Sequence, residues 1–221
     1  MPGPLARGDG RDTPAMSDGP RVVAILRGIT PSEAPGVGEA LYAAGFRDIE
    51  VPLNSPEPYA SISALRSGLP LDCRVGAGTV LRAVDVRACH DSGAQLIVSP
   101  NTDPRVIGAT LDLGMESVPG ASTPTEAFTA IEAGANSVKV FPGEVVRPAG
   151  LRAWRAVIPR HVGLIAVGGV SIDTIHEWLA AGAAGVGVGS TLYRPGRPAA
   201  EVGAAAARII ATVAASQEEQ A

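Results

Sequence analysis

The 221-residue sequence is poor in lysine, cysteine and aromatic residues. Aromatic residues make up only 4% of the chain although 46% of it is hydrophobic, so small and branched aliphatic side chains must build the core. A formal net charge of −4, with arginines scattered rather than clustered, argues against a nucleic-acid-binding surface. No segment approaches the roughly 20 apolar residues that span a bilayer, so we expect no membrane partner.

The two cysteines, Cys73 and Cys89, match neither a metal-binding spacing nor a disulfide framework. We expect both to be reduced thiols in the core of a cytoplasmic protein. The histidines are separated along the chain and form no H-E-x-x-H pattern, so the sequence predicts no protein-built metal site.

The two ends of the chain differ from its middle. Residues 1–20 mix Pro, Gly, Asp and Arg without periodicity and lack the apolar stretch of a secretory signal, which predicts a disordered or extended tail. Residues 216–221 are expected to fray. Residues 21–215 are long enough for one substantial domain.

One pattern recurs through this middle region. A helical stretch ends in a small residue and glycine, and an apolar strand follows within one to three residues. The instances are AAGFRDIEV, DSGAQLIVS, DLGMESVPG, EAGANSVKV and AAGAAGVGV, with glycines Gly45, Gly93, Gly114, Gly134 and Gly182. Glycine suits these positions because a helix often ends with a residue in the left-handed conformation. Two gaps between the glycines are about twice as long as the others, and each contains one more apolar strand, near Cys73 and near Ile165.

The helix starts carry signals as well. A capping side chain precedes proline or an acidic residue at five places, namely Thr30, Ser55, Asp103, Thr123 and Ser171. With a first strand at residues 22–26 and a last helix at residues 199–215, the chain contains eight strand–helix units. This number predicts an α/β fold, a single-domain (β/α)8 TIM barrel, with a doubly wound open sheet as the alternative.

In such a barrel the chemistry lies at the carboxyl ends of the strands. Lys139 is the only lysine among 18 basic residues, and it lies in the apolar stretch VKVF. Arginine is a poor imine-forming residue because its guanidinium stays protonated, whereas a desolvated lysine can attack a carbonyl. Lys139 is therefore predicted to be a reactive amine, and the alternative is a leftover surface lysine.

Other strand ends also carry polar residues. Glu50 ends an apolar strand, where desolvation would raise its pKa into the range useful for proton transfer; the alternative is a structural pair with an arginine. The glycines after the seventh and eighth strands suit phosphate because backbone N–H groups are accessible there, although tight turns would also explain them. This predicted phosphate site comprises Gly168, Gly169, Gly189 and Ser190, with Val167 before it. The run GVGVGS lacks the spacing of a dinucleotide fingerprint.

Arg27 and Thr79 follow the first and third strands. Singly they could be a rim charge and a helix cap. Together with a lysine imine they supply the guanidinium and the hydroxyl that a 2-oxo acid requires. Pro100 and Phe141 are expected to wall the pocket, or to serve packing alone.

These segments resemble a known family. AILRGITP, IEVPLNSP, VGAGTVL, QLIVSPN, EAFTAIEAGANSVKVFP, AVGGV and VGVGSTLYRPG are similar to the 2-dehydro-3-deoxy-phosphogluconate aldolase family, and most to its 2-dehydro-3-deoxy-6-phosphogalactonate branch. The likeness runs from about residue 22 to about residue 196. It implies a Schiff-base lysine at Lys139, an acid/base residue at Glu50 and a pyruvate contact at Thr79. It also implies phosphate binding by Gly168, Gly189 and Ser190, and a substrate-holding arginine at Arg27.

The resemblance also bears on the substrate. The gluconate branch typically has arginine at the position of Asn54 and threonine at that of Val167, so these two residues favour the galactonate epimer. The implied reaction is class I cleavage of 2-dehydro-3-deoxy-6-phosphogalactonate to pyruvate and glyceraldehyde 3-phosphate. No cofactor is expected, because the imine is the electron sink. The implied assembly is a homotrimer in the cytoplasm.

Several alternatives remain open. Within the family these are 2-dehydro-3-deoxy-6-phosphogluconate and 4-hydroxy-2-oxoglutarate aldolases. Outside it they are a phosphosugar epimerase or isomerase and a non-catalytic phosphosugar-binding barrel. Gly143 and Glu144 also depart from the small hydroxylated residues of the galactonate branch. A carboxylate there would repel a phosphate if it pointed inward.

Overall fold

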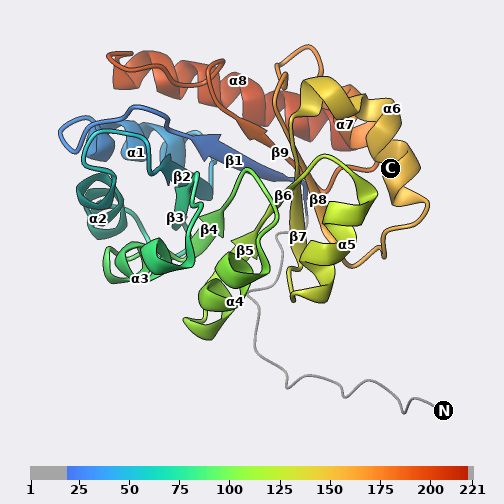
Figure 1. Cartoon of the computed structure of the whole chain (residues 1–221). Coiled ribbons are helices and arrows are strands. Elements are labelled where there is room, and N and C mark those ends of the chain that lie inside the picture. Colours follow the sequence, from blue (N-terminus) through green and yellow to red (C-terminus); the bar gives the residue numbers. More distant parts are fainter. Residues whose placement is uncertain (1–18, 219–221) are drawn as a thin grey trace.

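In the computed structural model, which describes residues 19–218, parallel strands form a nearly closed barrel with helices around it (Figure 1). The strands are β1 (Arg21–Ile25), β2 (Asp48–Pro52), β3 (Arg74–Gly78), β4 (Leu96–Val98), β5 (Glu116–Val118), β6 (Gly120–Ala121), β7 (Ser137–Val140), β8 (Gly163–Val167) and β9 (Gly185–Val188). The helices are α1 (Ala34–Ala43), α2 (Pro58–Gly68), α3 (Ala83–Asp91), α4 (Pro104–Asp112), α5 (Pro124–Glu132), α6 (Gly143–Arg155), α7 (Ile175–Ala180) and α8 (Ala199–Glu218). The predicted TIM barrel is confirmed.

The fifth strand of the barrel is divided at Pro119. Its first half, β5, pairs with β4, and its second half, β6, pairs with β7. Proline has no N–H to donate to a ladder, which is why the strand is interrupted there. The Pro119 carbonyl still accepts from the Lys139 N–H at 2.8 Å, so this strand brings the two edges of the sheet together. The nine strand segments therefore correspond to the eight predicted strands.

The glycines of the repeated pattern end helices as predicted. All five have positive φ, between 73° at Gly114 and 105° at Gly45. In this region a residue with a Cβ atom is strained, so glycine allows the chain to leave each helix and enter the next strand at once.

The helix starts agree with the sequence in two cases. Asp103 and Thr123 cap α4 and α5, and Thr123 forms a capping box with Glu126. The other three helices begin two or three residues later than predicted, at Ala34, Pro58 and Ile175. In each case the side chain or the backbone N–H of the expected capping residue has another partner.

These other partners connect loops or make turns. The Thr30 N–H donates to the Glu33 carboxylate at 3.0 Å, which forms a turn before α1. The Ser55 hydroxyl accepts from the Gly28 N–H at 2.9 Å and so ties the loop after β2 to the loop after β1. The Ser171 N–H donates to the Thr174 hydroxyl at 3.0 Å.

The core is aliphatic, as the low aromatic content predicts. Its largest fully buried side chains are leucines and isoleucines together with Phe46. Both cysteines are free and buried, which confirms the prediction of core thiols. Burial raises the pKa of the Cys73 thiol to about 11 and that of the Cys89 thiol to about 12.

Helix α8 is longer and more apolar than we expected. It runs to Glu218, so residues 216–218 belong to it rather than to a frayed end. By length and composition it could cross a membrane, with a mean hydropathy of 1.3, and the expectation that no segment approaches such a span was wrong for this helix. Nine of its 20 residues are alanine. It lies beside α1 in the outer layer, where Gly203 allows close approach to Ala40 (Figure 1).

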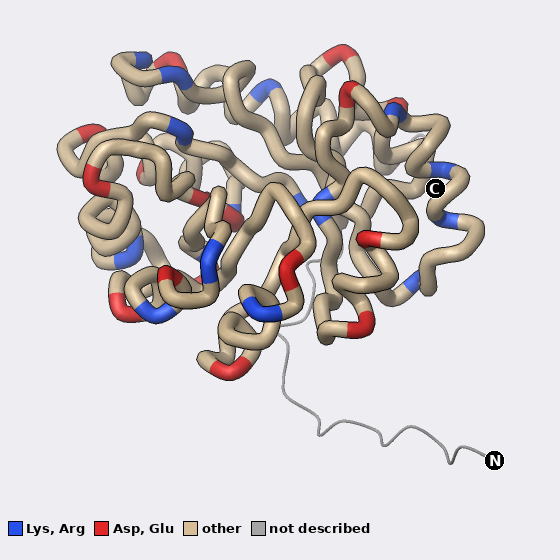
Figure 2. Tube along the Cα trace, in the orientation of Figure 1, with Lys and Arg blue, Asp and Glu red and all other residues tan. Residues whose placement is uncertain are grey.

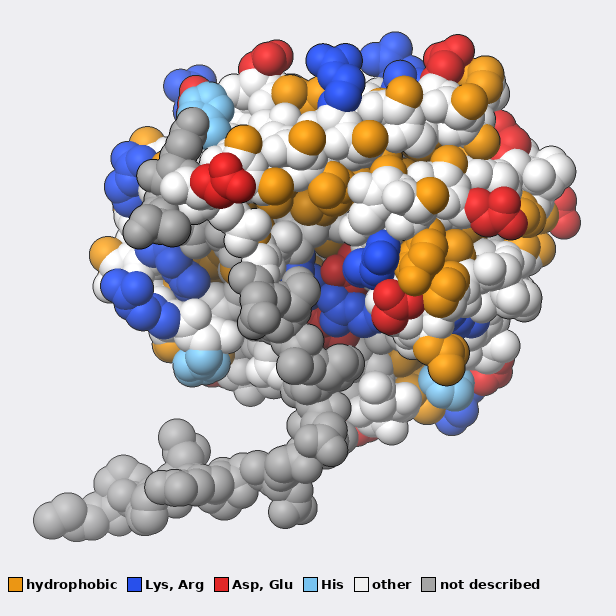
Figure 3. Space-filling view, turned by 180° about the vertical axis from the view of Figure 1, so that it is seen from behind, with side chains coloured by type: hydrophobic (Ala, Val, Ile, Leu, Met, Phe, Trp, Pro, Cys, Tyr) orange, Lys and Arg blue, Asp and Glu red, His pale blue; other side chains and the backbone are white. Residues whose placement is uncertain are grey.

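Charged residues are spread over the fold. Figure 2 shows acidic and basic positions interspersed along the chain, and Figure 3 shows both kinds of side chain among apolar ones on the rear face.

The residues predicted to form the N-terminal tail lie outside the described part of the chain, except for the last two.

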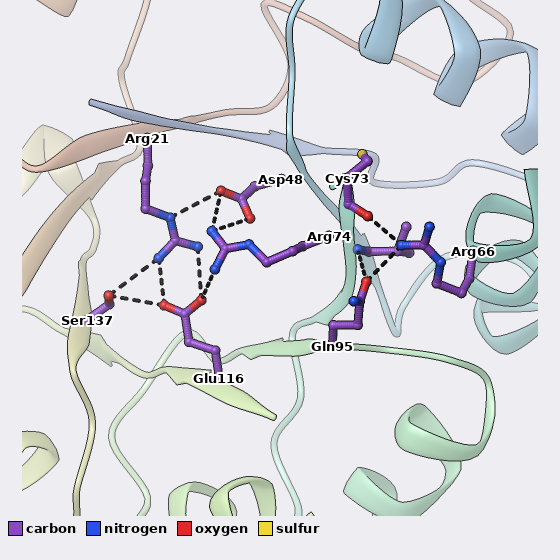
Figure 4. Close-up of polar contacts among 9 residues, drawn as sticks. Arg21, Asp48, Arg66, Cys73, Arg74, Gln95, Glu116 and Ser137 are labelled. Atoms are coloured by element: carbon purple, nitrogen blue, oxygen red, sulfur yellow. Dashed lines mark hydrogen bonds and ion pairs between the residues drawn. The ribbon is translucent and has the colours of Figure 1, made fainter. Parts of the chain in front are cut away.

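A network of ion pairs fills the amino-terminal end of the barrel (Figure 4). Arg21 contacts Asp48 at 3.1 Å and Glu116 at 2.6 Å, and Arg74 contacts the same two carboxylates at 2.7 and 2.9 Å. The Ser137 hydroxyl donates to Glu116 at 3.2 Å. Each carboxylate thus lies between two guanidinium groups, and the network balances its charges.

Candidate active site

Lys139 and Glu50 face the barrel interior from opposite walls. Lys139 lies in β7 and Glu50 in β2, and three strands separate these two in either direction around the barrel when β5 and β6 are taken as one. Both side chains line the same internal cavity. Its other walls are mainly aliphatic, made by Val23, Ile25, Leu96, Val98, Val118, Ile165 and Val167. The predicted convergence of the lysine and the carboxylate is therefore present in the geometry.

The Lys139 side chain is almost completely buried. The residue is 5% exposed, and burial lowers the pKa of its amine; Glu50 opposes this shift and Arg27 adds to it. Its Nζ lies 4.7 Å from the centre of the Phe141 ring. Within residues 19–218 no carboxylate forms an ion pair with it. An amine in this setting can be neutral, which is the form that attacks a carbonyl.

Glu50 is buried even more completely, at 2% exposure. Burial raises the pKa of its carboxyl group, and the positive charges of Lys139 and Arg27 limit the rise. Its Oε2 has no hydrogen-bond partner among the described residues. A carboxyl group with a raised pKa and an unpaired oxygen can accept and return a proton at neutral pH.

Gly78 makes room for this carboxyl group. It lies in β3, paired in register with Pro52 at the end of β2, and a Cβ atom at position 78 would overlap Oε2 of Glu50. The carboxyl group therefore lies directly against the backbone of the neighbouring strand. Sequence reasoning missed Gly78; the G-A-G run at the end of the third strand was the available signal.

Arg27, Asn54 and Thr79 are joined at the rim above Glu50. Arg27 donates to the Asn54 side-chain oxygen at 2.6 Å and to the Thr79 hydroxyl at 3.5 Å. Arg27 is exposed, so its guanidinium is accessible to a ligand. Asn54, considered in the sequence only for its bearing on the epimer, thus belongs to the same cluster as the two predicted substrate-binding residues.

The backbone of Thr79 is in a strained conformation. Its φ is 56°, in the left-handed region, which is rare for a β-branched residue. Such strain persists only where the surrounding structure enforces it, and it is concentrated at functional sites. Here it accompanies the turn that directs the Thr79 hydroxyl towards Arg27.

Pro100 and Phe141 lie on the Lys139 side of the mouth. The Pro100 backbone packs against Gly120, which is the register partner of Lys139 on β6. Phe141 follows β7 and places its ring beside the amine. Both positions are compatible with the predicted role as pocket walls.

The predicted phosphate-binding glycines follow two neighbouring strands. Gly168 and Gly169, after β8, have φ values of 101° and 65°, and consecutive amides in such turns can form an anion-binding concavity. Val167 lines the barrel cavity beside Gly187, its register partner on the neighbouring strand β9. Ser190 is exposed after β9 and lines a separate open cleft with Arg194 and Arg197. The barrel cavity and this cleft share no lining residue.

Glu144 lies against the turn after β8. A Cβ atom at Gly168 would overlap its Oε2, and one at Gly169 would come within 2.9 Å of its Cγ. Gly143 permits this approach because a Cβ there would overlap the Gly168 carbonyl. The Glu144 side chain therefore lies beside two of the glycines that were predicted to bind phosphate.

Comparison with known proteins identifies the family to which the chain belongs. The model of the KDPG and KHG aldolase family matches residues 16–201. The chain belongs to this family. The aldolase is 46% identical over 194 residues to the probable 2-dehydro-3-deoxy-6-phosphogalactonate aldolase of Rhizobium meliloti (strain 1021), covering 88% of this chain and 90% of that protein. It is also 46% identical over 176 residues to the 2-dehydro-3-deoxy-6-phosphogalactonate aldolase of Escherichia coli (strain K12), covering 80% and 86%.

A solved structure described as native KDPGal superimposes on this aldolase with a TM-score of 0.87. The two are 42% identical, and the match covers 89% of this chain and 96% of the other. The predicted family and the predicted class of enzyme, a lyase of the aldolase type, are therefore confirmed. Within residues 19–218 no group of three or more His, Cys, Asp and Glu side chains is placed to hold a metal ion.

Proposed function

We propose that this aldolase cleaves 2-dehydro-3-deoxy-6-phosphogalactonate to pyruvate and glyceraldehyde 3-phosphate through a Schiff base on Lys139. The observation that carries the proposal is that a buried lysine and a buried carboxyl group, neither paired with a counter-ion, line one cavity from opposite walls. The relatives at 46% identity that bear the phosphogalactonate name support the choice of substrate.

The reaction begins at the amine of Lys139. Neutral Nζ attacks the C2 carbonyl, and the resulting carbinolamine loses water to give a protonated imine. The imine is the electron sink for the next step. The burial of Lys139 favours the initial attack on the carbonyl, because an amine with a lowered pKa is available as the free base.

Glu50 transfers the protons. The Glu50 carboxylate takes the proton of the C4 hydroxyl, and the C3–C4 bond breaks. The electron pair of that bond moves to the imine and forms an enamine. Glyceraldehyde 3-phosphate leaves as the aldehyde. The carboxyl group then returns its proton to C3, and hydrolysis of the imine releases pyruvate and restores Lys139.

The remaining residues would hold the ends of the substrate. Arg27 and Thr79 would bind the C1 carboxylate, with Asn54 fixing the guanidinium. Gly168, Gly169, Gly189 and Ser190 would contact the phosphate. Asn54 and Val167 favour the galactonate epimer over the gluconate epimer, which differs at C4.

Borohydride trapping with pyruvate tests the Schiff base. We expect reduction to add a pyruvate-derived mass to Lys139 in the wild type and none in Lys139→Arg, with kcat lowered by about 10⁴-fold or more. Arginine keeps the positive charge, so an epimerase or isomerase that used Lys139 only as a charge would retain activity. A sensor would bind the phosphosugar without turnover.

The choice of epimer has its own measurement. We expect a higher kcat/KM for the 6-phosphogalactonate compound than for its 6-phosphogluconate epimer and for 4-hydroxy-2-oxoglutarate. Equal or faster turnover of the gluconate epimer would refute the interpretation of Asn54 and Val167. The expected homotrimer and cytoplasmic location also remain proposals that rest on the family resemblance, and sedimentation equilibrium measures the first.

A further inference from the structure

The loop after β1 (residues 26–33) and the loop after β9 (residues 189–198) follow neighbouring strands, and the carboxylate of Glu33 joins them. Its Oε2 accepts from the Thr30 N–H at 3.0 Å and from the Thr30 hydroxyl at 2.7 Å, within the first loop. Its Oε1 accepts from the Gly196 N–H at 3.0 Å, 163 residues further along the chain. These bonds, above all that of the Thr30 hydroxyl, lower the pKa of Glu33, so the bridging group is an ionised carboxylate at neutral pH.

The same two loops also pack against each other at a second point. Gly28 has a φ of 84°, and a Cβ atom there would lie 2.7 Å from Cγ of Pro195. Tyr193, in the loop after β9, is buried. Its burial and the nearby charge of Glu33 raise the pKa of its hydroxyl to about 12. The bond between Glu33 and the Gly196 amide is therefore part of a packed contact between the loops.

The loop after β9 is also tied to itself. Arg194 Nε donates to the Ser190 carbonyl at 3.2 Å, and Arg197 donates to the Leu192 carbonyl at 2.9 Å. Gly196 lies between these two arginines in the chain, so a shift of Gly196 moves the groups that hold Ser190. The proposed function assigns Ser190 to the phosphate of the substrate. A bond at Gly196 can therefore influence the phosphate end of the site without touching the phosphate.

The other end of the site is held in a different way. The Arg27 guanidinium, which the proposed function assigns to the C1 carboxylate, donates to Asn54 and Thr79. The next residue, Gly28, donates its N–H to the Ser55 hydroxyl. These three bonds lead to the loops after β2 and β3, so they remain when the bond to the loop after β9 is lost.

We propose that Glu33 is a positioning residue that holds the loop after β9, and Ser190 with it, at the distance from Arg27 that a phosphorylated substrate requires. The proposal rests on the proposed function, because it takes Ser190 as a phosphate contact and Arg27 as the carboxylate contact. Without the bridge the loop is in place in only a fraction of the molecules, and the apparent affinity for the phosphate end falls with that fraction.

Kinetics in the direction of synthesis provide the main test, because they measure the two ends of the substrate separately. Glu33→Ala removes the acceptor of the Gly196 N–H. We expect KM for glyceraldehyde 3-phosphate to rise about tenfold or more, which is the size of a lost hydrogen bond to a charged group. KM for pyruvate and kcat should stay at their wild-type values. A residue that served folding alone would lower kcat through the folded fraction and leave both KM values unchanged.

Two further variants separate the bridge from the turn before α1. Glu33→Gln keeps one accepting oxygen at the same reach, so its KM for glyceraldehyde 3-phosphate should lie between those of Glu33→Ala and the wild type. Thr30→Val is the matched control: it removes the hydroxyl donor, keeps the shape of the side chain and leaves the Gly196 bond in place. Both of its KM values should be unchanged, and a rise as large as in Glu33→Ala would contradict the proposal. If Glu33→Ala does not fold, an unchanged KM in Glu33→Gln refutes it.

Hydrogen exchange followed by mass spectrometry measures the bridge without turnover. Peptides that cover residues 189–198 should exchange faster in Glu33→Ala than in the wild type, because the Gly196 N–H has lost its acceptor. Peptides that cover β7 should exchange at the wild-type rate. Unaltered exchange in the loop after β9, or an equal rise in both KM values, would overturn the proposal. Failure of the proposed function is seen separately, as absence of the pyruvate adduct on Lys139 in the wild type.

Discussion

The two ends of the barrel interior both contain buried ionisable side chains, but only one end pairs them. At the amino-terminal end two arginines and two carboxylates form four ion pairs between 2.6 and 3.1 Å. At the other end Lys139 and Glu50 are buried to a similar degree without a counter-ion in contact. Apolar side chains, among them Val23, Leu96 and Ile165, line the cavity between the two ends.

This difference shows how one barrel can use buried charge for two purposes. Where each charge has a partner, burial keeps the groups ionised and specifies which strands are neighbours. Where the partners are absent, burial shifts the pKa of each group towards its neutral form, which is the condition for nucleophilic and proton-transfer chemistry. The paired end should therefore govern stability and the unpaired end activity.

Removing one carboxylate from the paired end should have the largest effect on stability. Asp48→Ala leaves Arg21, itself only 6% exposed, with one partner fewer, and we expect the free energy of unfolding to fall by about 3–5 kcal/mol. Urea denaturation measures this change. Asp72→Ala, which breaks the exposed pair with Arg47, should cost less than about 1 kcal/mol. Similar losses in the two variants would show that the buried network has no special role.

Crowding the unpaired end should reduce activity while the fold is kept. Gly78→Ala places a methyl group where Oε2 of Glu50 lies, so the carboxyl group must move. We expect kcat to fall by about 10- to 100-fold, because misplacing a catalytic group by about 1 Å has effects of this size. The pyruvate adduct on Lys139 should still form. Gly68→Ala, at a glycine with open space around it, should leave kcat unchanged, and an unchanged kcat in Gly78→Ala would mean that Glu50 tolerates displacement.

The smallest expected effect is a gain in stability in Glu50→Gln, in contrast to the loss expected for Asp48→Ala. Because burial raises the pKa of Glu50, the folded protein holds this proton above pH 4.5, where the unfolded chain releases it. The wild type therefore loses stability as the pH rises from 4.5 through the folded-state pKa, whereas Glu50→Gln does not. We expect the variant to be more stable than the wild type by about 1 kcal/mol at pH 8, with a smaller gain at pH 4.

Urea denaturation of both proteins at the two pH values checks this prediction. Activity should fall by about 10²- to 10⁴-fold in the same variant, since it lacks the proton-transfer group. A Glu50→Gln protein that was less stable than the wild type at pH 8 would indicate that the carboxylate is stabilised by the site rather than strained in it.

The features that could be predicted from the sequence are those with local causes. The glycines that end helices, such as Gly45 and Gly182, follow from the left-handed conformation that a helix terminus needs. Lys139 could be singled out because it is the only lysine and lies in an apolar strand. Its position opposite Glu50 followed from counting strands around a closed barrel.

The features that could not be predicted depend on contacts between distant segments. Arg21 and Glu116 are 95 residues apart and meet only when the barrel closes. The need for glycine at position 78 comes from the Glu50 side chain, which reaches over from β2. The position of Glu144 against the loop after β8 depends on the packing of Gly143 on that loop. The late start of α1 depends on the turn before it, in which the Glu33 carboxylate accepts from the Thr30 N–H. A rule that looks only for a capping side chain at Thr30 does not foresee this turn.

The single lysine has a practical consequence. Every other basic side chain is a guanidinium or an imidazole, and the only side-chain amine is enclosed within the barrel. A reagent that acylates lysine can therefore reach its target only through the same opening as the substrate. Incorporation of the label at Lys139, located by peptide mapping because the N-terminal α-amine reacts as well, would count competent active sites, and pyruvate would protect against it.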